Sequence, residues 1–477
     1  MTMTRRGFLS ASAALATTAA LRPVRWAGAS VPREADVVVI GAGAAGIAAA
    51  RRIAAAKRKV IVIEAASQVG GRCMTDVSTF GLPFDRGARW LYNPDNNPMI
   101  NLARNLGLDL SQVSLGQKIR IGRRYARPGE TEEFLAALVR AKQAITAAAR
   151  GRLDETCAAA IPSDLGDWAG TVEFVLGAGA TGKDLKDLSA VDKAHARDRT
   201  ATIGCKQGLG TLIAKLGGQL PLSLSTPATR IAWNNRNVAV DTPSGRITAH
   251  AAIITVSTNV LTAGGIKFVP DLPKRYLDAA ARLSLGSYDH IALQMPGNPL
   301  GLSHDDVLIE QSSSTHTGQL YANIGGSSLC VMDIGGSFGR DLSAQGEAAM
   351  VAFATEWLTK LFGSDAAKAI KKTSATRWND QAYVRGAMSA AAPGGQFARS
   401  ILTEPIGCLF VAGEATHENL WGTVDGAWES GERAANAALR KIGPLREAMP
   451  ARVRGRPVRR YHRRVPTRSK RWAFPIR

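Results

Sequence analysis

The hydrophobic pattern is clearest near the start of the chain, between residues 36 and 64. Residues 37–40 are four apolar β-forming residues, a run typical of a strand buried on both faces. An alanine-rich run of helical character follows at residues 44–56, and a second apolar run at residues 60–63 ends at Glu64. This order of strand, helix and strand predicts an α/β fold.

Later segments show both kinds of pattern. Residues 132–150 have the apolar spacing of a helix, and a second helix is expected over residues 344–361. Residues 204–216 begin with a glycine turn and continue as a helix. Strand-like runs are expected at residues 228–240, 246–256, 291–295 and 329–334.

Three glycines follow the first strand at the spacing G-x-G-x-x-G, namely Gly41, Gly43 and Gly46. The first permits a tight turn, the second lets a pyrophosphate approach the backbone and the helix N-terminus, and the third lets helix pack against strand. Glu64 lies eighteen residues after Gly46, where a carboxylate can accept hydrogen bonds from a ribose diol. The stretch predicts dinucleotide binding; the alternative is a glycine-rich loop in another kind of α/β protein.

Length and composition bound the architecture. The chain has 477 residues, more than one hydrophobic core usually serves, which favours two domains. The five cysteines are scattered without a C-x-x-C pair, and the seven histidines show no paired spacing. Neither a disulfide framework nor a metal site is therefore predicted.

The formal net charge of +21 is concentrated at the two ends of the chain. Residues 446–477 contribute +11 and residues 1–34 contribute +4. The basic tail also carries aromatic residues, so it could bind nucleic acid or anionic lipid. By composition a disordered, solvated extension is favoured, and no nucleic-acid partner is expected.

The N-terminus has the features of an export signal. Arg5 and Arg6 precede a short, weakly hydrophobic run to Leu21 and a small-residue segment at residues 27–29. This combination is typical of signals read by the twin-arginine export machinery, and the run is too short to span a bilayer stably. Residues 1–29 are predicted to be a signal peptide and the mature protein to be periplasmic or secreted; the alternative is a basic N-terminus that merely frays.

Four further segments carry recognisable motifs. Gly70, Gly71 and Arg72 form a G-G-R triplet, and residues 84–90 read F-D-R-G-A-R-W. A motif W-x-x-x-x-Y-x-x-G begins at Trp378, and the final motif comprises residues 409–417 and 422–431. Together with the glycine fingerprint, and in this order, these segments resemble the flavin-dependent amine oxidase family from residue 36 to about residue 440.

The resemblance implies a two-domain FAD-binding (Rossmann-like) fold of the α/β class. The discontinuous dinucleotide domain is expected at residues 35–90, 201–265 and 396–445. A substrate domain with a mixed sheet is expected at residues 91–200 and 266–395, followed by the basic tail at residues 446–477.

FAD is the implied cofactor. Arg72 offers a cationic fork to a phosphate, Glu414 is directed toward the ribityl chain, and a helix starting near Val424 aims free N–H groups at the flavin's pyrimidine end. Ala387 stands where covalent-flavin members have cysteine, which implies noncovalent FAD. The expected FAD-binding residues are Gly41, Gly43, Ala44, Ala45, Gly46, Glu64, Gly71, Arg72, Gly87, Ala88, Arg89, Trp90, Ala228, Gly413, Glu414, Thr423 and Val424.

The implied reaction is oxidation of an amine C–N bond by hydride transfer to flavin N5. The imine hydrolyses, and oxygen or another acceptor reoxidises the flavin. His290 falls where members often have a lysine that holds a water; it could hold that water, accept a proton, or be a structural histidine.

Two further positions bear on the choice of amine. Met388 and Thr423 fall at the two aromatic positions of monoamine oxidases, so the aromatic cage is missing unless Trp421 or Tyr383 replaces it. A bulkier secondary amine, or one with another polar group, is therefore expected in preference to simple arylalkylamines.

Other functions remain open from the sequence. Arg89 lies one residue from the place where L-amino-acid oxidases carry a carboxylate-binding arginine, so an amino-acid oxidase or a desaturase-like flavoprotein is an alternative. Because the lysine and the aromatic cage are absent, a protein that binds flavin without turning over a substrate is a further alternative. Ser337, in a G-x-S-x-G stretch, precedes Asp380 and His417 in hydrolase order, although a hydrolase would not need the FAD motifs.

Overall fold

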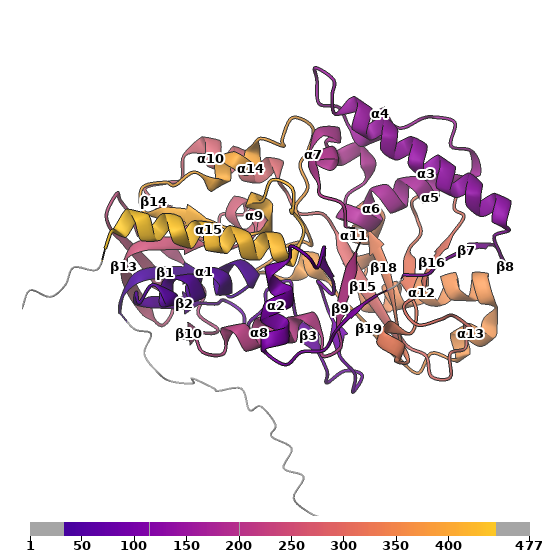
Figure 1. Cartoon of the computed structure of the whole chain (residues 1–477), viewed down its shortest axis with the longest axis horizontal. Helices are drawn as coiled ribbons and strands as arrows, with labels where there is room; N and C mark the ends of the chain where they lie inside the picture. The colour runs from indigo at the N-terminus through magenta and orange to yellow at the C-terminus, as the bar shows by residue number, and fades with distance from the viewer. Residues whose placement is uncertain (1–32, 114, 200, 445–477) are drawn as a thin grey trace, which may run out of the picture. The chain divides into compact units, whose positions relative to one another are not determined.

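The computed structural model describes residues 33–113, 115–199 and 201–444 (Figure 1). The predicted signal peptide at residues 1–29 and the basic tail at residues 446–477 lie outside these residues. Within the described part, residues up to Ile442 belong to one compact unit, which is built from two sheets with their covering helices.

The first sheet has eight strands. At its centre β1 (Glu34–Ile40) runs parallel to β2 (Val60–Ile63) on one side and to β13 (Gly245–Ile254) on the other. Because successive residues of a strand face opposite sides, alternate residues of β1 enter two different cores. The remaining strands are β10 (Leu222–Ser223), β11 (Arg230–Trp233), β12 (Val238–Thr242), β14 (Lys267–Val269) and β20 (Leu409–Val411).

Helices cover both faces of the first sheet (Figure 1). One face is covered by α1 (Ala44–Ala55), α2 (Pro98–Asn105), α8 (Leu209–Gly217) and α15 (Val424–Ile442). The opposite face is covered by α9 (Thr258–Thr262), α10 (Lys274–Arg282) and α14 (Ala398–Thr403). The predicted α/β class is therefore confirmed.

The second sheet has seven strands and is mixed. Its strands are β7 (Gln117–Ile121), β8 (Arg124–Tyr125), β15 (Tyr288–Gln294), β16 (Val307–Glu310), β17 (Gln319–Tyr321), β18 (Leu329–Gly335) and β19 (Lys372–Ala375). One core lies between this sheet and the helices α12 (Glu347–Phe362) and α13 (Ser364–Lys368). The helix α11 (Gly336–Ala344) precedes α12 in the chain. Another lies under α3 (Pro128–Ala148), α4 (Cys157–Ala160), α5 (Ala169–Leu176) and α7 (Ala190–His195), with α6 (Ala178–Thr181) beside them.

Two small sheets complete the described part of the unit. One consists of β5 (Leu91–Tyr92), β9 (Thr202–Cys205) and β6 (Leu110–Gln112). The other pairs β3 (Thr75–Asp76) with β4 (Phe84–Asp85). Strands β3, β4 and β5 lie within or next to the motifs at residues 70–72 and 84–90.

One expectation from the sequence needs correction. The predicted boundary after residue 265 lies too early, because β14 pairs with β11 and α10 packs in a core of the first sheet. The helix expected at residues 344–361 is found as α12, which begins at Glu347 because Gly346, with a φ of +102°, separates it from α11. The helix expected at residues 132–150 is found as α3, and none of the described helices is long and apolar enough to cross a membrane.

Candidate functional site

A cavity of about 1270 Å³ is lined by residues of both sheets. The first sheet contributes the carboxyl ends of β1 and β2, where ligands of open α/β sheets bind, and the second contributes side chains of β15, β17 and β18. Sixteen of the seventeen predicted FAD-binding residues line this cavity, and Gly46 is the exception. The sequence motifs therefore converge on one place.

Gly46 acts through packing. A Cβ at this position would lie 1.9 Å from the carbonyl oxygen of Gly41, so only glycine lets α1 approach β1 this closely. This is the role expected of the third glycine, and it explains why Gly46 does not reach the cavity.

The glycines around the start of α1 leave space that fits a pyrophosphate. Gly43 is the N-cap of α1 and supplies no side-chain cap, so the first N–H groups of the helix remain available to a ligand. A Cβ on Gly43 would have only one neighbouring atom within 4 Å, the carbonyl oxygen of Gly70 at 3.8 Å. A Cβ on Gly413, which has a φ of +138°, would meet nothing within 4 Å and would project into the cavity.

Glu64 lies at the end of β2, held by the backbone. Its Oε2 accepts from the N–H of Ala42 at 2.6 Å and its Oε1 from the N–H of Ala66 at 2.8 Å. Burial raises the pKa of Glu64, against the effect of these hydrogen bonds. The two oxygens keep further lone pairs, so the carboxyl group can still accept a ribose hydroxyl as predicted.

The half-buried Arg72 and the buried Glu414 form an ion pair in the cavity wall. Arg72 Nη1 donates to Glu414 Oε1 at 2.8 Å and to the carbonyl oxygen of Ala387 at 2.6 Å. Among the described residues, Arg72 Nε and Nη2 have no hydrogen-bond partner, which leaves that edge of the guanidinium for a phosphate.

The role predicted for Glu414 changes. Besides Arg72, its carboxylate accepts from the N–H and hydroxyl of Ser389 and from the N–H of Gly422. These donors fill the four lone-pair positions of a carboxylate, so Glu414 holds three cavity segments together and has no vacant acceptor for a ribityl hydroxyl. Burial raises the pKa of Glu414, but the charge of Arg72 and these hydrogen bonds outweigh it and lower the pKa.

His290 is held from both sides of its ring. Nδ1 lies 2.6 Å from Asp333 Oδ1, and Nε2 lies 3.0 Å from the carbonyl oxygen of Gly87. Both nitrogens therefore face protein acceptors, and neither is left to hold a water or take a proton from substrate. Of the roles considered from the sequence, the structural one fits, although the ring does line the cavity.

Asp333 is the centre of this cluster. It lies opposite His290 in the antiparallel pairing of β15 with β18, and both its oxygens are within 2.5 Å of Arg89 Nη2. Tyr288 donates its hydroxyl to Asp333 Oδ2 at 2.5 Å. Burial raises the pKa of Asp333, but the charges of Arg89 and His290 outweigh it and lower the pKa.

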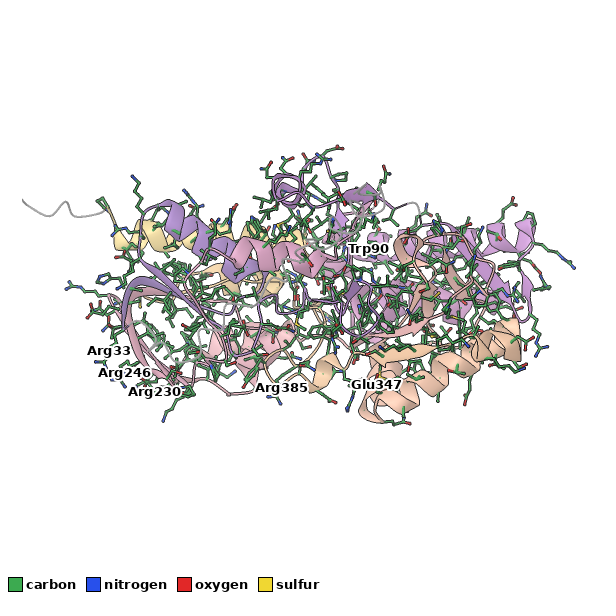
Figure 2. All side chains as sticks on the ribbon, turned by 90° about the horizontal axis from the view of Figure 1, so that it is seen from below. Arg33, Trp90, Arg230, Arg246, Glu347 and Arg385 are labelled. Carbon is green, nitrogen blue, oxygen red and sulfur yellow. The ribbon has the colours of Figure 1, made fainter. Side chains whose placement is uncertain are left out.

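The cavity has an aromatic wall that the motifs did not reveal. Tyr92, Tyr288 and Tyr321 line it together with the predicted Trp90. The ring centroids of Trp90 and Tyr321 are 6.2 Å apart, and the Arg89 guanidinium lies 4.5 Å from the Tyr321 ring. In Figure 2, Trp90 lies well away from Arg33, Arg230 and Arg246, which gather at the outer end of the first sheet.

The alternation of side chains along a strand could have indicated from the sequence that Tyr288 lies at the site. It stands two residues before His290 on a strand, so both side chains face the same side of the sheet. No comparable signal marks Tyr321, Asp333 or Arg199, because their proximity to the FAD motifs depends on strand pairing between distant segments.

The two positions at which monoamine oxidases carry the aromatic cage line the cavity in this chain. Of the two residues considered as replacements for the cage, Trp421 does not line the cavity. Met388 and Thr423 are lining residues, and Thr423 also caps α15, accepting from the N–H of Gly426 at 3.0 Å. Trp421 is 1% exposed and packs away from the cavity, so it cannot form a cage. Tyr383 lines the cavity but is 52% exposed.

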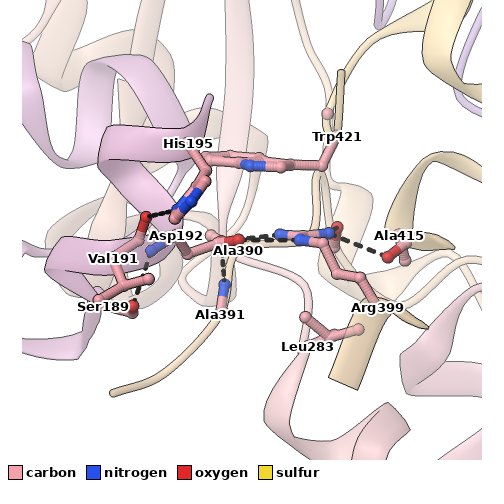
Figure 3. A network of polar contacts seen from close by, with 12 residues as sticks. Ser189, Val191, Asp192, His195, Leu283, Ala390, Ala391, Arg399, Ala415 and Trp421 are labelled. Carbon is pink, nitrogen blue, oxygen red and sulfur yellow. Dashed lines mark hydrogen bonds and ion pairs between the residues drawn. The ribbon is translucent and has the colours of Figure 1, made fainter. Parts of the chain in front are cut away.

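Trp421 belongs instead to a buried network (Figure 3). Its ring lies 5.0 Å from the guanidinium of Arg399, which forms two 2.8 Å bonds with Asp192 of α7. Arg399 also donates to the Ser389 hydroxyl at 3.2 Å, and that hydroxyl donates to Glu414. The network thus connects a helix over the second sheet to the wall of the predicted FAD site.

The residues of the hydrolase alternative do not meet. Ser337 donates its hydroxyl to Asp184 at 2.5 Å, Asp380 pairs with Arg377, and His417 lies 3.0 Å from Glu429. Among the described residues, no group of three or more His, Cys, Asp and Glu side chains could hold a metal ion.

Comparison with known proteins agrees with this geometry. The model of the family "Flavin containing amine oxidoreductase" matches residues 44–439. Polyamine oxidase 5 of Oryza sativa subsp. japonica is 29% identical over 461 residues, which cover 88% of this chain and 90% of that protein. Lysine-specific histone demethylase 1B of Mus musculus is 27% identical over 442 residues, 84% of this chain, but the match spans only 52% of its length.

Solved structures show the same fold. Cyclohexylamine oxidase from Brevibacterium oxydans IH-35A has a TM-score of 0.72 at 21% identity, covering 85% of this chain and 99% of that chain. A putrescine oxidase bound to putrescine has a TM-score of 0.71 at 20% identity, covering 85% and 98%. The family match and these names agree with FAD as the cofactor and with amine oxidation: the chain belongs to the flavin-containing amine oxidoreductases.

Proposed function

We propose that this chain binds FAD noncovalently and oxidises the C–N bond of an amine. The observation that carries the proposal is the shared cavity, in which the dinucleotide motifs and the aromatic wall of the second sheet line one space. When bound, FAD supplies a two-electron acceptor at flavin N5. The uncharged amine gives up hydride from its α-carbon, its nitrogen lone pair forms the C=N bond, and water hydrolyses the resulting imine.

The residues of the chain hold and orient the reactants. The α1 N-terminus and Arg72 would hold the phosphates, and Glu64 would accept from the ribose. The N-terminus of α15, at Val424, lines the cavity, where its helix N–H groups favour negative charge. Trp90 and Tyr321 supply aromatic surface against which the apolar part of an amine would pack.

Ala387 supports noncovalent binding. It lines the cavity at the position where a linking cysteine would stand, and its methyl group cannot form a thioether to the flavin. Oxygen or another acceptor would serve to reoxidise the bound flavin.

The test is anaerobic reduction of the purified holoprotein. Addition of a substrate amine should bleach the flavin absorbance in a stopped-flow instrument, and heat or acid should then release free FAD into the supernatant. Flavin that stays with the washed precipitate contradicts noncovalent binding. A holoprotein that no member of a broad panel of amines, polyamines and amino acids reduces contradicts the oxidase function and favours a flavin-binding protein without turnover.

We also propose that residues 1–29 are a twin-arginine signal and that the mature protein works in the periplasm or outside the cell. Support comes from the sequence alone: Arg5 and Arg6, the weakly hydrophobic run and the small-residue end. This route carries folded proteins, which suits a chain that must enclose its cofactor before export.

A further inference from the structure

The first turn of α15 carries a buried acid that the proposed function does not use. Asp425 is the second residue of the helix and is only 3% exposed. Thr423, Val424 and Ala427 line the cavity, whereas Asp425 does not. Its carboxyl group therefore lies within the wall, at the end of the helix that meets the cavity.

One oxygen of this carboxyl group is unpaired. Asp425 Oδ1 is buried and has no hydrogen-bond partner among the residues that the structure describes. Burial raises the pKa of Asp425, and the charge of Arg199 is among the effects that oppose this rise. A buried anion with so few partners is costly to keep, and water screens its charge only weakly, so the charge acts on neighbouring groups.

Arg199 brings a positive charge to the same place. Its Nη2 donates to the carbonyl oxygen of Trp421 at 2.8 Å and lies 3.4 Å from where a Cβ on Gly422 would stand. Both residues come just before α15, and Arg199 itself lines the cavity. Neither contact neutralises the guanidinium, so a cation and a buried acid stand at the start of one helix.

This end of α15 borders the part of the cavity that remains for the flavin ring and the amine. A Cβ on Gly422 would also lie 3.4 Å from the sulfur of Met388, a lining residue at one of the two cage positions. Under the proposed function the pyrophosphate lies at the start of α1. Gly422 and Met388 therefore belong to the wall that is left for the ring and the amine.

Charges at this place act on the redox balance of the flavin. A hydride carries two electrons and one proton, so the ring that accepts it gains one negative charge. The free N–H groups of α15 and the guanidinium of Arg199 favour that charge, and an ionised Asp425 opposes it. The equilibrium between oxidised and reduced flavin therefore depends on both residues.

We propose that Arg199 and Asp425 set the reduction potential of the bound flavin in opposite directions. Arg199 raises the potential together with the N-terminus of α15, and the Asp425 carboxylate lowers it. A lower potential makes the reduced flavin a stronger donor of its two electrons to oxygen or another acceptor, and makes its reduction by the amine less favourable. The inference rests on the proposed FAD binding and assigns to Asp425 a role that acts through charge alone.

The test measures the midpoint potential of the FAD-loaded protein without any amine. Dithionite reduces the protein anaerobically beside a reference dye, and the absorbance gives the oxidised fraction of each. Asp425→Asn should favour the reduced flavin about tenfold, which is about 30 mV for a two-electron couple. Arg199→Met should favour the oxidised flavin by a similar factor.

Glu432→Gln is the matched control. It removes the same charge from the same helix, but Glu432 is exposed and does not line the cavity. The glutamine oxygen can still accept from Trp428 Nε1. The potential should therefore stay unchanged, because water screens an exposed charge. Thermal unfolding of all variants separates a change of potential from a loss of stability.

The pH dependence is a second measurement. Protonated Asp425 has the charge of asparagine, so the difference in potential between the unmodified protein and Asp425→Asn should shrink as the pH falls through the raised pKa of Asp425. The other titratable and charged groups within reach are Tyr92, Arg199 and Glu429. They are the same in both proteins, so their titration cancels in the difference.

Equal potentials in Asp425→Asn and Glu432→Gln at every pH, or a higher potential in Arg199→Met, overturn the proposal while leaving FAD binding and amine oxidation intact. A loss of stability in Asp425→Asn without a change of potential also overturns it, because that result shows a structural role. Should Asp425→Asn fail to hold FAD, Asp425→Ser removes the same charge and is held to the same outcome, and Arg199→Met decides independently. An unmodified protein that binds no FAD refutes the proposed function and this inference with it.

Discussion

At the residue scale, the site is decided by which polar atoms are already paired. His290 and Glu414 lie where the motifs place them, yet each is saturated by protein partners. Their chemistry is therefore to hold neighbouring segments, whereas Arg72 and Glu64 keep hydrogen-bonding positions for a ligand. Pairing between buried groups cannot be seen in a sequence, because it depends on distances between distant segments.

Asp333→Asn should be strongly destabilising. It leaves the charge of Arg89 in a buried cluster without its anion, and breaking a buried pair typically costs about 3–5 kcal/mol. Urea denaturation of the purified protein measures the loss. The matched control is Asp278→Asn, whose exposed pair with Lys274 on α10 should change the free energy of unfolding by no more than about 0.5 kcal/mol.

The difference in stability between the unmodified protein and Asp333→Asn should depend on pH. The pKa of Asp333 is lowered below its ordinary value of 3.8, so its contribution is fully present above that value and is lost as the pH falls through the lowered folded-state pKa. The stability difference between the unmodified protein and Asp333→Asn should thus shrink below about pH 4. A difference that grows on acidification would argue that Asp333 is protonated in the folded state.

Met388→Tyr should shift the choice of amine. Met388 is a flexible part of the cavity wall, and a rigid ring there narrows the space for the substrate. Activity on benzylamine, expected to be poor in the unmodified protein, should rise, and activity on the preferred substrate should fall; steady-state kcat/KM for both reports this. Efficient benzylamine oxidation by the unmodified protein contradicts the idea, and since Trp421 is buried elsewhere, Tyr383 would be the residue to examine.

At the element scale, glycines set how closely helices approach the first sheet and each other. A Cβ on Gly431 of α15 would lie 2.1 Å from the carbonyl oxygen of Ala45 in α1. That contact sets how closely α15 approaches the start of α1, and the N-terminal residues of both helices line the cavity. Thr423 adds to this by capping α15, so its role at the cavity is inseparable from helix formation.

Gly431→Ala should weaken FAD binding and lower stability together. The added methyl group must push α15 away from α1, an overpacking that costs about 1–3 kcal/mol. Fluorescence titration of apoprotein with FAD and thermal unfolding measure the two effects. Gly129→Ala is the control, because Gly129 lies in α3 with nothing within 4 Å of its added Cβ; it should keep FAD affinity and gain up to about 1 kcal/mol from helix propensity.

At the scale of the whole molecule, the site exists only where the two sheets contribute to one cavity. The Asp192–Arg399–Ser389–Glu414 network runs from α7 to the FAD side of the cavity, so the two parts are held by buried polar bonds as well as by apolar packing. Figure 3 shows its first step, the pair of Asp192 with Arg399 beside the ring of Trp421.

Replacing both Arg5 and Arg6 by Lys should block export. Lysine keeps the charge but loses the paired guanidinium groups that the twin-arginine machinery reads. Immunoblots of cytoplasmic and periplasmic fractions should show folded, FAD-containing protein retained in the cytoplasm. Arg22→Lys, beyond the twin pair, is the control and should be exported normally; undiminished periplasmic protein in the double variant argues against the signal.

By itself the sequence determined the family, the cofactor and the first βαβ segment, because those depend on local requirements. Local requirements select particular residue types at a fixed spacing: glycine for the tight turn at Gly41, glycine for the close helix packing at Gly46, and an acidic residue after β2. The tertiary structure alone decided what lines the amine's half of the cavity. Tyr92, Arg199, Tyr321 and Asp333 come from four separate strands or their ends and meet only through long-range pairing. The structure also places Trp421 in a core and not in the aromatic cage for which it was a candidate. The sequence could not decide this, since an aromatic residue has the same local sequence pattern whether it packs inward or faces a ligand.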